Sequence, residues 1–292
     1  ELTLAKDSLR DVVHQLENRH NGVAEDRIKT GYPDIDKQIG GLFKGDFIVI
    51  AGRPSMGKTT IAMNIAENVA VRQKTPCTVF SLEMPKSHLL NRSVCSLGKV
   101  DFSRFLDGRL NEDDWPRVTS AISMLNPAKL YLNDSNDWSI PKIRSAFRKA
   151  ARAGAELIIF DYLQMLGGHS ENRANYLAEV SRNFKAAAKE LNIPIIALAQ
   201  LNRSCEQRPN KRPMPSDLRE CGQIEQDADV ICLAYRDEVY NPETQHKGIA
   251  EFHFAKVRNG RQGTVRMVSR LDMCRFDSFT GNLPPLSDTS IK

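Results

Sequence analysis

Short apolar runs alternate with longer helical stretches from residue 46 onward, and this alternation is the strongest pattern in the chain. The runs are DFIVIA at 46–51, TVFSLE at 78–83, KLYLND at 129–134, LIIFD at 157–161, IIALAQ at 195–200 and VICLAY at 230–235. Apolar runs of this length, separated by helical segments, predict a mainly parallel sheet with helices on its faces. We therefore expect an α/β domain over residues 46–292.

The first twenty residues predict a helix that precedes this domain. Its apolar positions recur at helical spacing and form one stripe, Leu9, Val12, Val13 and Leu16. Residues 21–45 are rich in glycine, aspartate and other polar residues, which predicts a linker that leads into the core of the domain. Because the chain does not begin with methionine and its first helix has an apolar stripe to cover, we expect a further domain to precede it.

Composition narrows the class of protein. Of the 292 residues, 41% are hydrophobic and 26% are charged, and no apolar run approaches the length of a transmembrane helix, so we expect no membrane segment. A net charge of +5 permits a polyanionic partner where cations cluster. The six cysteines show no metal-ligand spacing and no secretory signal opens the chain, so we expect reduced thiols and a cytoplasmic location.

The first chemical motif is GRPSMGKT at residues 52–59, which fits G-x-x-x-x-G-K-[ST]. It lies between the apolar run DFIVIA and a helix that we expect to begin near Thr59. Backbone N–H groups of such a loop bind phosphates, Lys58 reaches the β- and γ-phosphates, and Thr59 binds Mg²⁺. The alternative is a glycine-rich turn with a solvated lysine. The strand before it and the helix after it favour a site for ATP and Mg²⁺.

Three polar residues end other predicted strands, where ligands of parallel sheets bind. Asp161 ends LIIFD and is placed to hold Mg²⁺ through its water shell. Glu83 ends TVFSLE and is placed to polarise the attacking water. Gln200 ends IIALAQ and can contact the γ-phosphate. The alternatives are a turn-capping aspartate and ordinary surface residues, and the position beside a phosphate loop favours catalysis.

A long basic segment, residues 201–222, follows Gln200. Its cations are Arg203, Arg208, Lys211, Arg212 and Arg219. No aromatic residue is interleaved, so we expect contacts to the backbone of single-stranded DNA that are indifferent to sequence. A second candidate segment, LGGHSENRAN at 166–175, contains Arg173. For both segments the alternative is a solvated, mobile loop.

The stretch FHFAKVRNGRQG at 252–263 predicts a strand, a turn around Gly260 and another strand. Lys256 and Arg258 stand two positions apart, which places both side chains on one face of a pleated strand. Two cations side by side at a strand end suit an anion. The alternative is a solvated strand terminus.

These residues together resemble a known family. The motifs are TGYPDID, GRPSMGKTT, SLEMP, IIFDYLQ, ALAQLNRSCEQR, KRPMPSDLRECGQIEQDADVI, YRDEVY and KVRNGRQGTVR. They extend almost end to end and resemble the C-terminal motor domain of the DnaB family of replicative DNA helicases. The resemblance implies a RecA-like P-loop ATPase fold, a hexameric ring, and ATP-driven movement along single-stranded DNA from 5′ to 3′.

The resemblance also implies roles for single residues. Glu83 would be the catalytic base, Asp161 part of the Walker B motif, and Gln200 the γ-phosphate sensor. Arg258 would be an arginine finger that reaches the ATP of the neighbouring subunit, with Lys256 on the same phosphate. The expected nucleotide contacts within one subunit are Gly52, Ser55, Met56, Gly57, Lys58, Thr59, Thr60 and Arg92. The expected DNA contacts are Arg219, Glu220 and Gly222, together with Arg203 and Arg173 from the two basic segments.

The family's partners follow by the same resemblance. The first helix would pack on the adjacent subunit, and a helicase loader and primase would be partners, primase mainly through a domain preceding this chain. A RecA-like recombinase filament and a nucleotide-switched DNA scaffold or loader are the alternatives. The motifs are shared by bacterial and phage proteins, so they leave the origin open.

Overall fold

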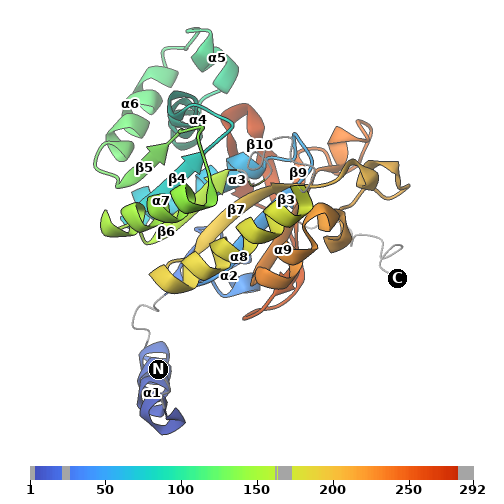
Figure 1. The fold of residues 1–292 in the computed structure, drawn as a ribbon. Helices are drawn as coiled ribbons and strands as arrows, with labels where there is room; N and C mark the ends of the chain where they lie inside the picture. Colours follow the sequence, from blue (N-terminus) through green and yellow to red (C-terminus); the bar gives the residue numbers. More distant parts are fainter. Residues whose placement is uncertain (1–3, 22–26, 162, 164–172, 282–292) are drawn as a thin grey trace.

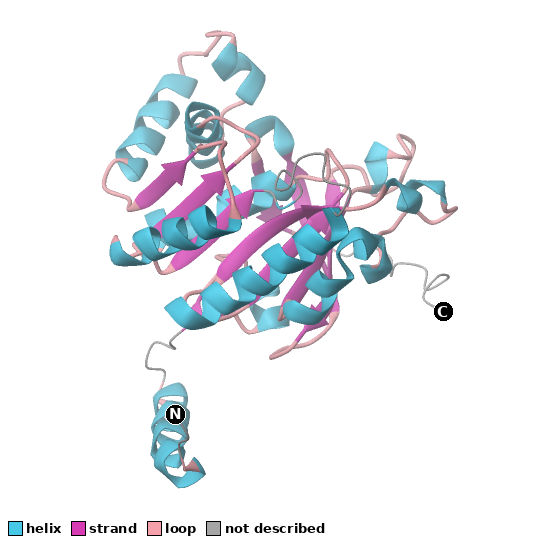
Figure 2. Cartoon of the chain, viewed as in Figure 1, coloured by secondary structure: helices cyan, strands magenta, loops and turns pink. Residues whose placement is uncertain are grey.

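One large sheet organises the domain (Figures 1 and 2). The computed structural model describes residues 4–21, 27–161, 163 and 173–281. Within these residues, the sheet has nine strands in the order β11-β10-β9-β8-β3-β7-β6-β4-β5. The strands are β3 (Phe47–Gly52), β4 (Cys77–Ser81), β5 (Leu130–Asn133), β6 (Leu157–Asp161), β7 (Ile195–Gln200), β8 (Val230–Tyr235), β9 (Ile249–Val257), β10 (Gly263–Arg270) and β11 (Arg275–Ser278).

Strands β3 to β8 pair in parallel, and β9 to β11 continue the sheet in antiparallel pairs. The predicted mainly parallel sheet is therefore confirmed, as is the strand-turn-strand around Gly260. A Cβ at Gly260 would lie 2.7 Å from the carbonyl oxygen of Gln38, so the hairpin turn approaches the backbone of a neighbouring helix where only glycine fits.

Helices cover both faces of the sheet (Figure 1). The α-helices of this domain are α2 (Pro33–Ile39), α3 (Lys58–Glu67), α4 (Lys86–Gly98), α5 (Phe102–Leu106), α6 (Asp114–Leu125), α7 (Ile140–Arg152), α8 (Arg173–Leu191) and α9 (Gly222–Asp227). Alternate residues of β3 enter two different cores. Ile48 and Ile50 pack with α2 and α3, whereas Phe47, Val49 and Ala51 pack with α7 and α8. Burial on both faces explains why these strands read as continuous apolar runs.

The segment before the sheet differs from the expectation of a linker over residues 21–45. Strand β1 (Arg27–Ile28) pairs with β2 (Leu42–Phe43), and α2 lies between them in sequence. Five apolar side chains of this segment are at most 8% exposed, namely Ile28, Tyr32, Ile35, Ile39 and Leu42. The packed domain therefore begins near Arg27, because these widely spaced apolar residues join the core despite the polar residues between them.

Helix α1 (Ala5–His20) lies apart from the sheet (Figure 1). The four residues of its apolar stripe are between 49 and 59% exposed. This amphipathic helix agrees with the prediction from spacing, and the domain leaves its stripe uncovered. Across the described residues, the helices are too short or too polar for any of them to cross a membrane.

Candidate functional site

The loop between β3 and α3 has the backbone expected of a phosphate loop. Ser55 and Gly57 adopt positive φ angles of 67° and 87°, and Gly57 precedes the first residue of α3, Lys58. No side chain caps the helix and its first turn carries no acidic residue. The first N–H groups of a helix have no partner within it, so this positive helix end is available to an anion.

A hollow of about 500 Å³ opens beside this loop at the carboxyl edge of the sheet. Eight of the residues expected at the nucleotide line it, namely Ser55, Gly57, Lys58, Thr59, Thr60, Glu83, Arg92 and Gln200. Two residues expected to contact the nucleotide, Gly52 and Met56, do not line the hollow. Gly52 is the last residue of β3, and the side chain of Met56 is 1% exposed in the core, where its sulfur accepts the N–H of Arg236. Any phosphate contact of Met56 must come from its backbone.

The residues expected to hold Mg²⁺ meet at the floor of the site. Thr59 Oγ1 donates a hydrogen bond of 2.7 Å to Oδ2 of Asp161, which is 3% exposed. Burial raises the pKa of Asp161 to about 6, while the Thr59 hydrogen bond and Lys58 oppose the shift. Hydroxyl and carboxylate oxygens are the ligand type that Mg²⁺ prefers. The residues present therefore fit a magnesium nucleotide.

Lys58 lies in the same site, and Nζ donates to the carbonyl oxygen of Arg53 at 3.1 Å. Burial lowers the pKa of Lys58, and the charges of Asp161 and Glu83 counteract this. The sequence predicted that Glu83 is the last residue of a strand, and this prediction is wrong. Strand β4 ends at Ser81, and Glu83 stands exposed in the bend that follows. Met84 N–H donates to Ser81 Oγ and fixes that bend, which directs the carboxylate to the hollow.

Arg53 connects the phosphate loop to the segment after Gln200. Its guanidinium donates to Glu206 Oε1 at 2.9 Å and to the carbonyl oxygen of Leu201 at 2.9 Å. Tyr240 also donates to Glu206. Sequence analysis assigns no role to Arg53, because its partners lie about 150 residues away in the chain.

Residues 201–222 contain regular structure and ion pairs, which a solvated loop would lack. They contain the 3-10 helices Arg203–Gln207 and Pro215–Cys221. Arg208 makes a bidentate ion pair with Asp217, with distances of 2.7 and 2.9 Å. Arg212 makes another with Glu251, at 2.8 and 2.9 Å. These two cations hold the segment in place, which corrects the interpretation that all its cations face a partner.

The structure describes only some of the residues that are expected to contact DNA. Arg203 is exposed, and Gly222 is exposed at the start of α9. The side chains of Arg219, Glu220 and Arg173 lie outside the described residues, as does most of the segment 166–175. Their roles stay predictions.

Lys256 and Arg258 lie at the opposite edge of the sheet from the phosphate loop. Val257 pairs with Val230, the first residue of β8, and β8 runs parallel to β3. With six residues in β3 and a rise of about 3.3 Å per residue, the two edges are roughly 20 Å apart. Neither cation can therefore reach the nucleotide site of its own chain.

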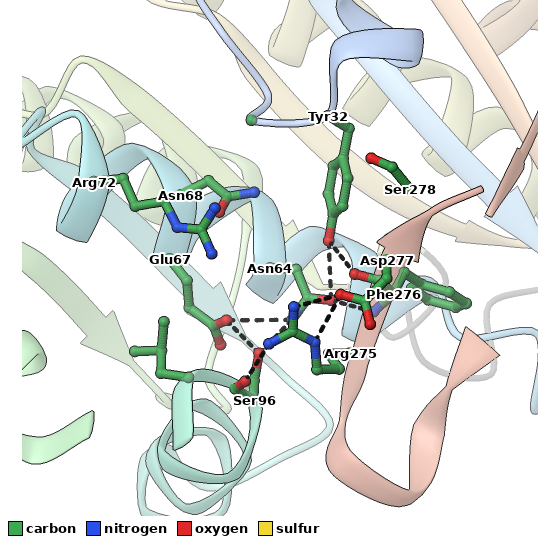
Figure 3. Close-up of a pocket in the computed structure, with 12 residues that line it drawn as sticks. Tyr32, Asn64, Glu67, Asn68, Arg72, Ser96, Arg275, Phe276, Asp277 and Ser278 are labelled. Carbon is green, nitrogen blue, oxygen red and sulfur yellow. Dashed lines mark hydrogen bonds and ion pairs between the residues drawn. The ribbon is translucent and has the colours of Figure 1, made fainter. Parts of the chain in front are cut away.

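A second, smaller pocket of about 110 Å³ lies behind α3 (Figure 3). Asn64 links its walls, because Oδ1 accepts the N–H of Phe276 at 3.0 Å and the hydroxyl of Tyr32 at 3.3 Å. Glu67 is 3% exposed and accepts from Ser96 Oγ at 2.7 Å. Burial raises the pKa of Glu67 to about 7. Sequence analysis assigns these residues no role, since they come from four separate segments of the chain.

Comparison with known proteins decides the family. The family model described as DnaB-like helicase C terminal domain matches residues 27–278. The chain belongs to this family. Its RecA-like fold is confirmed by the solved ATPase domain of G40P, which has a TM-score of 0.87, is 33% identical, and overlaps 96% of this chain and all of that one.

Two further relatives define how much of a DnaB-family protein this chain represents. The replicative DNA helicase DnaB of Buchnera aphidicola subsp. Acyrthosiphon pisum is 48% identical over 267 residues, which is 90% of this chain and 58% of that protein. The structure titled "The Structure Of A DnaB-Like Replicative Helicase And Its Interactions With Primase" has a TM-score of 0.85 and 33% identity, over 96% of this chain and 68% of that one. The chain thus spans little more than half of its curated DnaB relative.

Proposed function

We propose that this domain is the ATP-driven motor of a replicative DNA helicase, which hydrolyses ATP with Mg²⁺ and moves along single-stranded DNA from 5′ to 3′. The observation that carries the proposal is the division of charged groups between two edges of one sheet. The carboxyl edge holds the phosphate loop, Asp161 and Glu83, while Lys256 and Arg258 lie at the amino edge. A complete site then needs a second copy of the chain.

The charged and polar residues of this site have separate roles in phosphoryl transfer. The N–H groups at the start of α3 and the Lys58 ammonium bind the phosphates, and Thr59 and Asp161 hold the metal. Mg²⁺, when bound, neutralises charge on the β- and γ-phosphates. Glu83 accepts a proton from the attacking water, and its exposed position leaves room for that water. Gln200 contacts the γ-phosphate.

Arg258 supplies charge from the neighbouring subunit. An arginine finger stabilises the charge on the γ-phosphoryl oxygens and raises the rate by about 10³ to 10⁵ in other NTPases. Its side chain is 55% exposed, so it is accessible to a partner. A closed ring of six subunits places every Arg258 at a neighbour's phosphate loop and makes hydrolysis depend on subunit position.

Helix α1 provides a second contact between subunits. Its stripe of Leu9, Val12, Val13 and Leu16 finds no cover on its own domain. Helices α4, α5 and α6 expose large apolar side chains, namely Leu90, Leu106, Trp115 and Ile122, which are 42 to 59% exposed. Exposed apolar surface of this kind marks interaction sites. We assign the helices α4 to α6 of the adjacent subunit as the surface that receives α1.

The DNA contacts of the motor come from the segment after Gln200. Arg203, Arg219 and the backbone around Glu220 and Gly222 bind phosphates of the single strand, and Arg173 adds a contact from the second basic segment. Arg53 joins this segment to the phosphate loop, so loss of the γ-phosphate can move it. Successive subunits then advance along the strand in turn.

The whole protein works with other replication proteins. One structural relative is described in its interactions with primase, and we propose primase and a helicase loader as partners of the full-length protein. The domain boundaries that we propose are a linker helix over residues 1–20 and a motor domain from near Arg27. We place the protein in the cytoplasm of a bacterium or of a phage-infected cell.

The direct test is unwinding of a forked duplex by the full-length protein. We expect ATP-dependent separation of strands when the fork carries a 5′ tail, and none with Lys58→Ala. Exchange of homologous strands without unwinding would identify a recombinase instead. Tight ATP binding with negligible hydrolysis on single-stranded DNA would identify a nucleotide-switched scaffold.

A further inference from the structure

Arg258 is held by a buried carboxylate of its own chain. Arg258 Nη1 lies 2.9 Å from Oδ1 of Asp229, and the backbone N–H of Arg258 donates to the carbonyl oxygen of Asp229 at 2.9 Å. Asp229 is 1% exposed, whereas the Arg258 side chain is 55% exposed. The guanidinium cannot keep this ion pair and also place the same nitrogen on a neighbour's phosphate. Binding in the neighbouring site therefore competes with Asp229.

Asp229 can release Arg258 without being left unpaired. Its Oδ2 lies 2.5 Å from Lys185 Nζ and accepts the N–H of Phe47 at 2.8 Å. A buried carboxylate that lost all its donors would be strongly destabilising, but these two contacts do not depend on Arg258. The site is thus suited to hold the arginine reversibly.

Lys256 is held next to it by the end of a helix. Its Nζ donates to the carbonyl oxygens of Glu225 at 2.6 Å and Gln226 at 3.1 Å. Both carbonyls belong to the last turn of α9, which ends at Asp227. The two cations therefore contact one short segment, residues 225–229.

This segment is the direct continuation of the proposed DNA-binding residues. The 3-10 helix Pro215–Cys221 runs without a break into α9, whose first residue is Gly222. Asp227 anchors α9 to the long helix α8, because Ser181 Oγ donates to it at 2.8 Å. A displacement of residues 219–222 is accordingly transmitted to the groups that hold Lys256 and Arg258.

We propose that residues 225–229 retain Lys256 and Arg258 on their own subunit, with Asp229 as the positioning residue, and that DNA bound at residues 219–222 releases them to the neighbour's ATP. The inference rests on the proposed function of these two cations and of the DNA-binding segment. It assigns a route from DNA to the intersubunit site that runs through α9, apart from the link through Arg53. Without DNA, the retained arginine keeps hydrolysis slow.

The test compares ATP hydrolysis by the full-length assembly with and without saturating single-stranded DNA. We expect Asp229→Asn to raise the DNA-free rate by about fivefold, the population shift that loss of one half-exposed ion pair produces, with the DNA-saturated rate within about twofold of wild type. A purely structural role would instead lower both rates by the same factor. Such a parallel loss, or an unchanged ratio of the two rates, would overturn the proposal.

Two variants make this test specific. Glu190→Gln is the control, since Glu190 also forms ion pairs with arginine, with Arg144 at 2.9 Å and with Arg148 at 2.7 Å, but both of these partners lie on α7. Its rate ratio should equal that of wild type. Ser181→Ala loosens the anchor of α9 with a small change at a buried position, and it should raise the DNA-free rate in the same direction. A wild-type ratio for a folded Ser181→Ala assembly would exclude the α9 route.

Arg258→Ala separates failure of this inference from failure of the proposed function. If Arg258→Ala retains hydrolysis stimulated by DNA, the arginine finger itself is wrong. If Arg258→Ala is inactive while Asp229→Asn keeps the wild-type ratio, the finger stands and only its retention by Asp229 is wrong.

Discussion

Thr59 Oγ1 donates to Oδ2 of Asp161 across 102 positions of sequence, at a distance of 2.7 Å. The contact joins the start of α3 to the end of β6 and places a hydroxyl and a buried carboxylate on one side of the phosphate loop. These are the two oxygens that the proposed function assigns to Mg²⁺.

Replacing Asp161 by asparagine should remove the charge that holds the metal while keeping a group of the same shape. We expect hydrolysis of ATP to fall by at least about a hundredfold, as for loss of a group that stabilises transition-state charge. Nucleotide affinity measured without Mg²⁺ should change little. Steady-state hydrolysis and binding titrations with and without Mg²⁺ check this, with Glu190→Gln, which removes one carboxylate charge near the end of α8, as the control. Equal loss of affinity in both titrations would mean that Asp161 has only a structural role.

A mixture of two inactive variants tests the shared active site. Lys58→Ala removes the phosphate-binding lysine and Arg258→Ala removes the finger, so each alone should hydrolyse almost no ATP with single-stranded DNA. Mixed subunits should regain activity, because a Lys58→Ala subunit donates its intact Arg258 to a neighbour with an intact loop. If the mixture assembles and stays inactive, Arg258 does not act between subunits.

The carboxyl of Glu67 behind α3 should make stability depend on pH (Figure 3). Burial raises its pKa from 4.5 to about 7, so the unfolded chain releases this proton first as the pH rises. The native state therefore loses stability between these values relative to a neutral side chain. As the pH rises from about 5 to about 8, the free energy of unfolding of Glu67→Gln should increase by about 2 kcal/mol relative to that of wild type.

Denaturant unfolding at the two pH values measures this difference. Glu156→Gln is the control, since Glu156 is an exposed carboxylate between α7 and β6. A gain for Glu67→Gln that is the same at both pH values would show that the effect comes from packing and not from the proton.

Arg203 should contribute a phosphate contact that carries no sequence information. Arg203→Ala is expected to weaken binding of single strands of different sequence by similar factors, and to flatten the dependence of log affinity on log salt by about one unit. The same holds for Arg219→Ala. Lys129→Ala removes an exposed cation just before β5, at the amino edge of the sheet, and should leave the salt dependence unchanged. An effect confined to one DNA sequence would contradict backbone recognition.

The sequence alone determined the strands of the parallel sheet, the phosphate loop, and Asp161 and Gln200 as the last residues of their strands. These signals are local: a strand buried on both faces is a continuous apolar run, and a phosphate loop is one contiguous motif. It also located Lys256 and Arg258 side by side. It placed the start of the domain too far along the chain. The apolar residues of the segment 27–45 are separated by polar ones, and only the tertiary packing shows that they belong to the core.

Tertiary structure decided which charges are available and which are already paired. Arg208 and Arg212 look like DNA ligands in the sequence, yet Asp217 and Glu251 neutralise them. Asp229, Glu67 and Arg53 have no local signature, since the partners described above are 29 to 182 positions away in the chain. An ion pair forms where two elements meet, and the meeting point depends on the register and packing of the whole sheet. For that reason a contiguous motif predicts the nucleotide site, while the ion pair between Asp229 and Arg258 is evident only in the folded structure.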